Sequence, residues 1–184
     1  MNVQTTAAPH SKQQVLDLIT KTFADRRLGK SPRTVVMGLP LFRMSWESTK
    51  PTVEHKGWRY LTLFNAQESF VVDAVTSRNT EFRFLFQRGS GRIWLQGLQN
   101  LLRRRQIKTP QFELRCLDVP AAHLSLLWLY STDAESLFLY LHNHGQVCRK
   151  EKLRKLEEVE REIEIAIEQK LAGFSRVRLP NVNS

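Results

Sequence analysis

Arginine and lysine carry the strongest chemical signal in this sequence, and phosphate binding is the chemistry that they offer. The chain has 28 Lys and Arg against 18 Asp and Glu, a formal net charge of +10 and a pI near 10.1. This charge favours an anionic partner, either nucleic acid or an acidic protein surface. Most of the excess falls in residues 26–59 and 78–115, whereas residues 149–170 are balanced in charge.

The second basic window contains a helix whose polar face could hold phosphates. We predict this helix over residues 91–106, with Gln96 and Gln99 on its polar face and Trp94 and Leu98 towards the core. The predicted phosphate-binding residues are Arg88, Arg92, Arg103, Arg104, Arg105 and Lys108. They form a basic edge that would bind a phosphate backbone with low sequence specificity.

The Gly-Ser-Gly-Arg turn before this helix has the composition of a phosphate cradle but not its spacing. The sequence has no GxxxxGK[ST], and the GxGxxG pattern fails because Trp94 stands three residues after Gly91. Gly89 and Gly91 are explained by a tight turn between strand and helix. No nucleotide cofactor, and no other cofactor, is predicted.

Alternating aromatic residues in two segments raise the alternative of a base-stacking surface. Each set falls on one face of a predicted strand: Phe82, Phe84 and Phe86 in one strand, Trp58, Tyr60 and Phe64 in the other. Such rings stack on bases only when they are exposed. Burial against amphipathic helices is the commoner outcome, and we predict that these residues are core.

Two acidic residues carry a different hypothesis, metal-dependent catalysis. Asp73 lies in one predicted strand, and Glu81-Phe82-Arg83 opens the next. Over residues 11–118 the order helix, three strands, helix, strand resembles the core of restriction-endonuclease-like nucleases, which place an Asp on one strand and Glu-x-Lys on the next. The resemblance implies catalytic roles for Asp73 and Glu81. Arg83 departs from the lysine of that pattern, and a guanidinium that stays protonated is a poor substitute near a metal-bound water.

The residues His142, His144 and Cys148 form the one metal-like cluster in the sequence. Histidines near the end of a helix are also explained by the helix dipole, and we predict no metal site. Both cysteines are expected to be reduced thiols, with Cys116 in an apolar strand. No catalytic triad can be assembled, so an enzyme is the less favoured class.

The elements that position these residues follow from periodicity and turn signals. We predict a helix at 11–27 with Ser11 as its N-cap, a strand at 34–42, and a loop at 48–57. A meander of three antiparallel strands then covers residues 58–88. After the helix come strands at 112–118 and 123–131, and a short helix between Thr132 and Gly145 with capping-box spacing.

The C-terminal part is predicted as one long charged helix over residues 147–172. Its narrow apolar seam includes Leu153, Leu156, Ile163 and Ile167. Basic residues fill its N-terminal half and acidic residues the rest, which is opposite to what the dipole favours. An antiparallel homodimer through this helix would pair the two halves; a solvated face with i,i+4 ion pairs is the alternative.

These observations predict an α+β fold with a mostly antiparallel sheet of four to six strands and helices on one face. The expected organisation is a flexible leader (1–10), an α+β domain (11–146), the long helix (147–172) and a flexible basic tail (173–184). The leading function is non-catalytic nucleic-acid binding, to DNA or RNA. The alternatives are an assembly factor acting through the C-terminal helix and the nuclease. No membrane span or signal segment is predicted, and a cytoplasmic location is expected.

Overall fold

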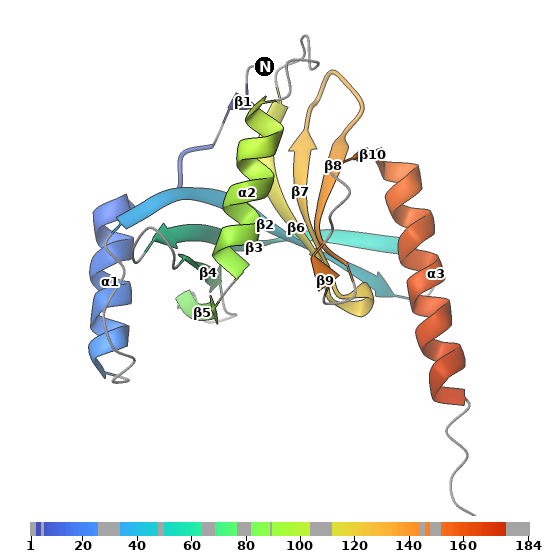
Figure 1. Ribbon diagram of the computed structural model, residues 1–184, viewed down its shortest axis with the longest axis horizontal. Helices are drawn as coiled ribbons and strands as arrows, with labels where there is room; N and C mark the ends of the chain where they lie inside the picture. The colour runs from blue at the N-terminus through green and yellow to red at the C-terminus, as the bar shows by residue number, and fades with distance from the viewer. Residues whose placement is uncertain are drawn as a thin grey trace, which may run out of the picture.

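In the described part of the chain, the computed structural model shows one mixed, mostly antiparallel sheet, three α-helices and a short 3-10 helix (Figure 1). The structure describes residues 3–4, 6–25, 34–47, 50–63, 69–76, 82–88, 90–103, 112–143, 146–147 and 152–175. The elements are β1 (Val3–Gln4), α1 (Lys12–Asp25), β2 (Thr34–Glu47), β3 (Lys50–Leu63), β4 (Ser69–Thr76), β5 (Phe82–Arg88), α2 (Ser90–Arg103), β6 (Phe112–Val119), the 3-10 helix η1 (Pro120–Ala122), β7 (Leu124–Tyr130), β8 (Leu137–Asn143), β9 (Gln146–Val147), β10 (Leu153–Lys155) and α3 (Leu156–Ser175). The predicted α+β class is confirmed.

The sheet has ten strands in the described part of the chain, more than the four to six predicted. The main order is β10-β8-β7-β6-β2-β3-β4-β5, with β1 beside β6 and β9 beside β8. The added strands are short or come from segments predicted as helix, loop or leader. In Figure 1 the β2–β3 hairpin crosses from the side of α1 towards α3, whereas β6, β7 and β8 run along the direction of α2.

Two meanders joined by one crossover build this sheet. Strands β2 to β5 pair consecutively and antiparallel, as do β6 to β8. The chain returns through α2 and places β6 parallel to β2, with Leu41 opposite Cys116 and Arg43 opposite Asp118. The three-strand meander predicted from the sequence is therefore confirmed as β3, β4 and β5.

The segment predicted as a loop at residues 48–57 is instead largely the first half of β3. It pairs with β2 from Glu47–Lys50 onwards, and Pro51 stands opposite Trp46. Polar and charged residues dominate the segment, so its own sequence gives a weak strand signal. The antiparallel partner β2 supplies the backbone hydrogen bonds that make it a strand.

Helices cover both faces of the sheet, and the prediction of one covered face is wrong. On β3, Leu61 belongs to the core under α2, whereas its neighbour Tyr60 packs with Val15 and Ile19 of α1. On β6, Cys116 faces α2 and Leu117 packs in the core under α3. Neighbouring residues of a strand point to opposite faces, so central strands that are apolar on both faces require helices on both. We call the side under α2 the α2 face and the opposite side, with α1 and α3, the α1/α3 face.

The start of α1 follows the prediction closely. The backbone N–H of Gln14 donates to Oγ of Ser11 at 3.2 Å, and the N–H of Ser11 donates to Oε1 of Gln14 at 2.9 Å. This reciprocal pair is a capping box, with glutamine in the return position. Ser11 as the N-cap is confirmed. The predicted leader before it contains β1, which pairs in parallel with Phe112 and Glu113.

The short helix predicted between Thr132 and Gly145 is replaced by β8. Its apolar residues alternate between the two covered faces: Leu139 and Leu141 lie in the core under α2, Phe138 and Tyr140 in the core under α3. A strand that is apolar on both faces reads as a continuous apolar run, which the sequence alone does not distinguish from a buried helix.

The C-terminal helix begins at Leu156, nine residues later than predicted. Leu153–Lys155 form β10, which pairs with Leu137–Leu139 of β8. The first turn of α3 is then acidic, with Glu157 and Glu158, and the carboxylate of Glu158 accepts a hydrogen bond from the N–H of Lys155. The unfavourable charge order inferred for a longer helix disappears, because the basic residues 152, 154 and 155 precede the helix. None of the helices in the described ranges is long and apolar enough to cross a membrane.

Candidate functional sites around two arginines

The helix that was predicted to carry the basic edge has the expected faces. Gln96 and Gln99 are exposed, and Trp94 and Leu98 are buried under the sheet. Arg103 is exposed in the last turn of α2. Arg88 ends β5 and Arg92 lies in the first turn of α2, but only their backbones are described; Arg104, Arg105 and Lys108 lie outside the described residues.

The sheet register brings Thr34 and Arg88, one residue from each basic window, to the same end of the sheet. Thr34, which directly follows the basic segment 26–33, stands opposite Leu63. Leu63 stands opposite Ser69, and Phe70 stands opposite Arg88. Adjacent strands lie about 4.8 Å apart, so the start of β2 and the end of β5 are separated by roughly 15 Å at this end.

The positive charge of the chain is distributed unevenly. Eleven of the 28 Lys and Arg and fourteen of the 18 Asp and Glu have described side chains, a balance of −3. The remaining side chains number seventeen basic and four acidic, a balance of +13 that yields the total of +10. Along the sequence, the basic excess lies mainly in residues 26–59 and 78–115.

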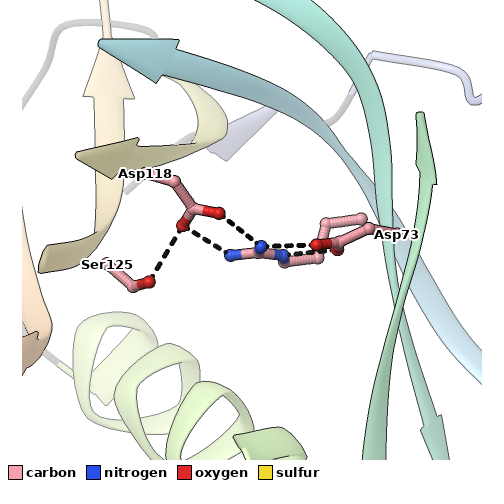
Figure 2. A network of polar contacts seen from close by, with 4 residues as sticks. Asp73, Asp118 and Ser125 are labelled. Atoms are coloured by element: carbon pink, nitrogen blue, oxygen red, sulfur yellow. Dashed lines mark hydrogen bonds and ion pairs between the residues drawn. The ribbon is translucent and has the colours of Figure 1, made fainter. Parts of the chain in front are cut away.

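A buried arginine, Arg59 of β3, joins three strands on the α2 face (Figure 2). Its Nε and Nη2 donate to the two carboxylate oxygens of Asp73 on β4, both at 2.7 Å. Its Nη1 and Nη2 donate to Asp118 on β6 at 2.9 and 2.6 Å. Asp118 also accepts a hydrogen bond from the hydroxyl of Ser125 on β7 at 2.9 Å. The guanidinium thus bridges across β2, which lies between β3 and β6.

The surroundings of Arg59 keep it charged. Burial opposes the charge of its guanidinium, but the hydrogen bonds and charges of Asp73 and Asp118 raise its pKa well above the ordinary value. The guanidinium carbon also lies 4.8 Å from the ring centroid of Trp94. Burial raises the pKa of the Asp73 carboxyl, so the ionised form of that group depends on Arg59. We interpret this network as a structural clamp.

The same network bears on the nuclease hypothesis. The carboxylate of Asp73 is buried and accepts both of its described hydrogen bonds from Arg59, an arrangement that leaves little room for a metal ion. Glu81 lies outside the described residues, and Arg83 is described only by its backbone in β5. Among the described side chains, no three of His, Cys, Asp and Glu are grouped as metal ligands.

A second arginine, Arg115 of β6, lies on the α1/α3 face among aromatic rings. Its guanidinium carbon is 3.6 Å from the ring centroid of Tyr130, 4.8 Å from that of Phe42 and 5.1 Å from that of Trp128. The rings continue to His55, whose centroid is 5.1 Å from that of Phe42. We call Arg115, Phe42, His55, Trp128 and Tyr130 the Arg115 platform. It spans the adjacent strands β7, β6, β2 and β3.

One side of the Arg115 guanidinium is held and the other is open. Nε and Nη2 donate to Glu113 at 3.0 and 2.5 Å, and Thr6 also donates to this carboxylate. Although burial acts in the other direction, these hydrogen bonds lower the pKa of Glu113. The Arg115 side chain is 17% exposed, and no described residue accepts a hydrogen bond from its Nη1.

A bulge in β3 separates the two sites. Gly57 stands opposite Leu41 and His55 opposite Phe42, so Lys56 has no partner of its own in the register. The extra residue lets His55 face the platform while Arg59 faces α2, although their spacing of four would place both on one face of a regular strand. Gly57 has φ +138°, and a Cβ there would lie 2.0 Å from the carbonyl oxygen of Ala74. Only glycine fits this position.

The sequence did not reveal the platform. Its rings come from three strands and its arginine from a fourth, and His55 lies in the segment predicted as a loop. The aromatic residues singled out from the sequence are different ones: Trp58 and Tyr60 are buried, as predicted for core residues, while the side chains of Phe82, Phe84 and Phe86 and all of Phe64 lie outside the described part. Residues 112–130 contain one arginine, Arg115, which lies far in sequence from Trp128 and Tyr130, so no local pattern marks the platform.

The apolar seam of the C-terminal helix is used within the chain. Ile163 is fully buried beside Val159 in the core under α3, and Ile167 packs at its edge. Leu153 lies in β10 and packs against the core under α2, whereas Leu156 is 39% exposed. The seam therefore packs mainly against the sheet of its own chain.

The cysteine and histidine candidates differ in how much of each residue the structure describes. Cys116 is a buried free thiol whose pKa is raised by burial, which makes it a core residue. His142 is described only as backbone in β8, and His144 and Cys148 lie outside the described residues.

Comparisons with known proteins add no assignment. No family model matches the chain, and neither a curated protein nor a solved structure matches it.

Proposed function

We propose that this protein is a non-catalytic nucleic-acid-binding protein that contacts the phosphate backbone through a basic edge, with low sequence specificity. The observation that carries this proposal is the net charge of +10, whose excess falls mainly in residues 26–59 and 78–115 while residues 149–170 are balanced. Lys and Arg side chains concentrated in two windows can neutralise the phosphates of a nucleic acid. The sheet register supports one shared edge, because it brings Arg88 to the sheet end where the segment 26–33 enters β2.

The assembly hypothesis, including homodimerisation through the C-terminal helix, receives less support. It needs a free apolar seam, and Ile163 and Val159 of that seam are buried within the chain. An acidic protein surface remains the alternative anionic partner. A cytoplasmic location stays a prediction from the composition of the sequence.

The test is a titration of duplex and single-stranded DNA at several salt concentrations. If phosphates are the target, the logarithm of the binding constant should fall linearly with the logarithm of salt concentration, with a slope of about 0.9 for each phosphate neutralised on B-DNA. A variant with Arg88, Arg92, Arg103, Arg104 and Arg105 replaced by Gln should bind more weakly and show a shallower slope.

A matched control removes five charges elsewhere. In this control Lys12, Lys21, Lys152, Lys155 and Arg161 are replaced by Gln, which gives the same net charge as the first variant. The control should keep most of the wild-type slope. Undetectable binding at low salt, or equal losses in both variants, would overturn the basic edge.

A further inference from the structure

We propose that the Arg115 platform binds the bases of single-stranded nucleic acid, by stacking on its rings and by hydrogen bonds from the open side of Arg115. This inference rests on the proposed function and narrows its substrate to single strands. The platform belongs to the α1/α3 face, opposite the buried Arg59 clamp.

The first argument is the exposure of the platform. Phe42, Trp128 and Tyr130 are half-buried, and His55 is exposed. Val53, which stands opposite Met44 on the same face, is 43% exposed. Aromatic side chains placed mainly for packing bury their rings in the core, as Trp58 and Tyr60 do in the neighbouring core under α1. Phe42 and Trp128 also pack against the core under α3, but the platform rings keep part of their surface at the solvent boundary.

The second argument is the geometry of the rings. The centroids of Phe42 and Trp128 are 5.3 Å apart, as are those of Trp128 and Tyr130. With His55 they form a continuous row across four adjacent strands. The two pairs meet edge to face, with interplanar angles of 77° and 84°. Exposed rings and a guanidinium are suited to bases, because every base has a π face and stacking tolerates any sequence.

The third argument is hydrogen bonding. Glu113 holds one side of Arg115, so the guanidinium is oriented without a ligand, while the N–H groups of Nη1 remain free for a base or phosphate oxygen. The indole Nε1 of Trp128 is buried and has no acceptor in the described part of the chain. Because this indole N–H is buried, the donor that the platform can offer to a ligand is Nη1 of Arg115.

These features select single strands over duplexes. Bases within a duplex are stacked on one another and present only their edges to the grooves, so their faces cannot stack on the rings of the platform.

The platform lies between the cores under α1 and α3, with Trp58 next to His55 on one side and Phe138 next to Trp128 on the other. The positive net charge of the chain attracts the single-stranded nucleic acid, and the aromatic rings then stack on its bases.

The experiment compares the affinity of the full-length chain for an oligothymidine of roughly 15 nucleotides and for a duplex of the same length. We expect His55→Ala and Tyr130→Leu each to weaken single-strand binding by about fivefold or more, with duplex binding and the salt slope unchanged. His123→Asn is the matched control: this exposed histidine lies at the turn between β6 and β7, and asparagine tolerates its left-handed backbone, φ 51°. It should change neither affinity.

Tryptophan fluorescence adds a direct readout. The oligothymidine should quench the emission of the wild type, and Trp128→Phe should remove much of that quenching while it keeps a ring in place. If Trp128→Phe does not fold, the His55 and Tyr130 variants still decide. If His55→Ala and Tyr130→Leu both bind the oligothymidine with an affinity within twofold of wild type, the platform proposal is overturned and the basic-edge proposal is not. Loss of single-strand binding in the five-arginine variant alone would likewise overturn the platform and support the basic edge. If the wild type binds neither nucleic acid and instead binds an acidic peptide, both proposals are overturned.

Discussion

Arg59 and Arg115 belong to neighbouring parts of one sheet, but the chain uses them in opposite ways. Arg59 is fully buried, and Asp73 and Asp118 accept four hydrogen bonds from it. Arg115 is 17% exposed and lies on aromatic rings. Its Nε and Nη2 donate to the carboxylate of Glu113, and no described residue accepts a hydrogen bond from Nη1. The difference shows how an arginine that is satisfied by the fold is distinguished from one that still has donors to offer.

The strand β6 makes this contrast possible. Arg115 and Asp118 are three residues apart, so they point to opposite faces, one to the platform and the other to the clamp. The clamp fixes β3, β4 and β6 to each other from the α2 face. It thereby supports the strands whose other face carries the platform.

The largest effect is expected from breaking the clamp. Arg59→Met leaves the carboxylates of Asp73 and Asp118 without their common partner, and we expect it to lower the free energy of unfolding by about 3–5 kcal/mol. Urea denaturation measures this loss, with Arg161→Met on the exposed face of α3 as the control. Adding Asp73→Asn and Asp118→Asn to Arg59→Met should restore part of the stability, because the uncompensated charges are removed. A loss below about 1 kcal/mol for Arg59→Met would show that the clamp is not structural.

The contrast also marks where sequence reasoning succeeds. The capping box of Ser11, the three-strand meander and the two faces of α2 were predictable, because their partners lie within one helix turn, within one helix, or on strands that follow each other directly in the chain. The ion pair of Arg59 with Asp118 joins residues 59 positions apart across an intervening strand. No local period carries that information.

Other failures have the same cause. β8 was predicted as helix because its apolar residues contribute to two covered faces. β10 was predicted as helix because only its pairing with β8 makes it a strand. The bulge at Lys56 shifts every later residue of β3 to the other face, and this shift decides that His55 joins the platform. The residues of the basic edge could be named from composition, but their grouping depends on the register of the sheet.

A smaller effect is expected at the bulge that separates the two arginine sites. Gly57→Ala forces a Cβ against the carbonyl of Ala74 at a φ that L residues rarely adopt, and we expect a loss of roughly 2–3 kcal/mol in the free energy of unfolding. The control is Gly97→Ala in α2, where the new Cβ meets the flexible end of Leu141 and helix propensity improves. Its stability should stay within about 1 kcal/mol of wild type. Equal effects of the two substitutions would contradict the role of the bulge.

The smallest effect is expected at Arg115, and its pH dependence tests how the platform is built. Arg115→Gln should lower the free energy of unfolding by about 1 kcal/mol at pH 7, through lost cation–π contacts and the lost pair with Glu113. Because the folded-state pKa of Glu113 is lowered, the stabilisation from this pair is fully present above the ordinary pKa of about 4.3 and is lost as the pH falls through the lowered value. The stability difference between wild type and Arg115→Gln should therefore narrow below about pH 4, as measured by urea denaturation across pH. In a Glu113→Gln background the difference should be nearly independent of pH, and a pH-dependent difference there would assign the effect to another carboxylate.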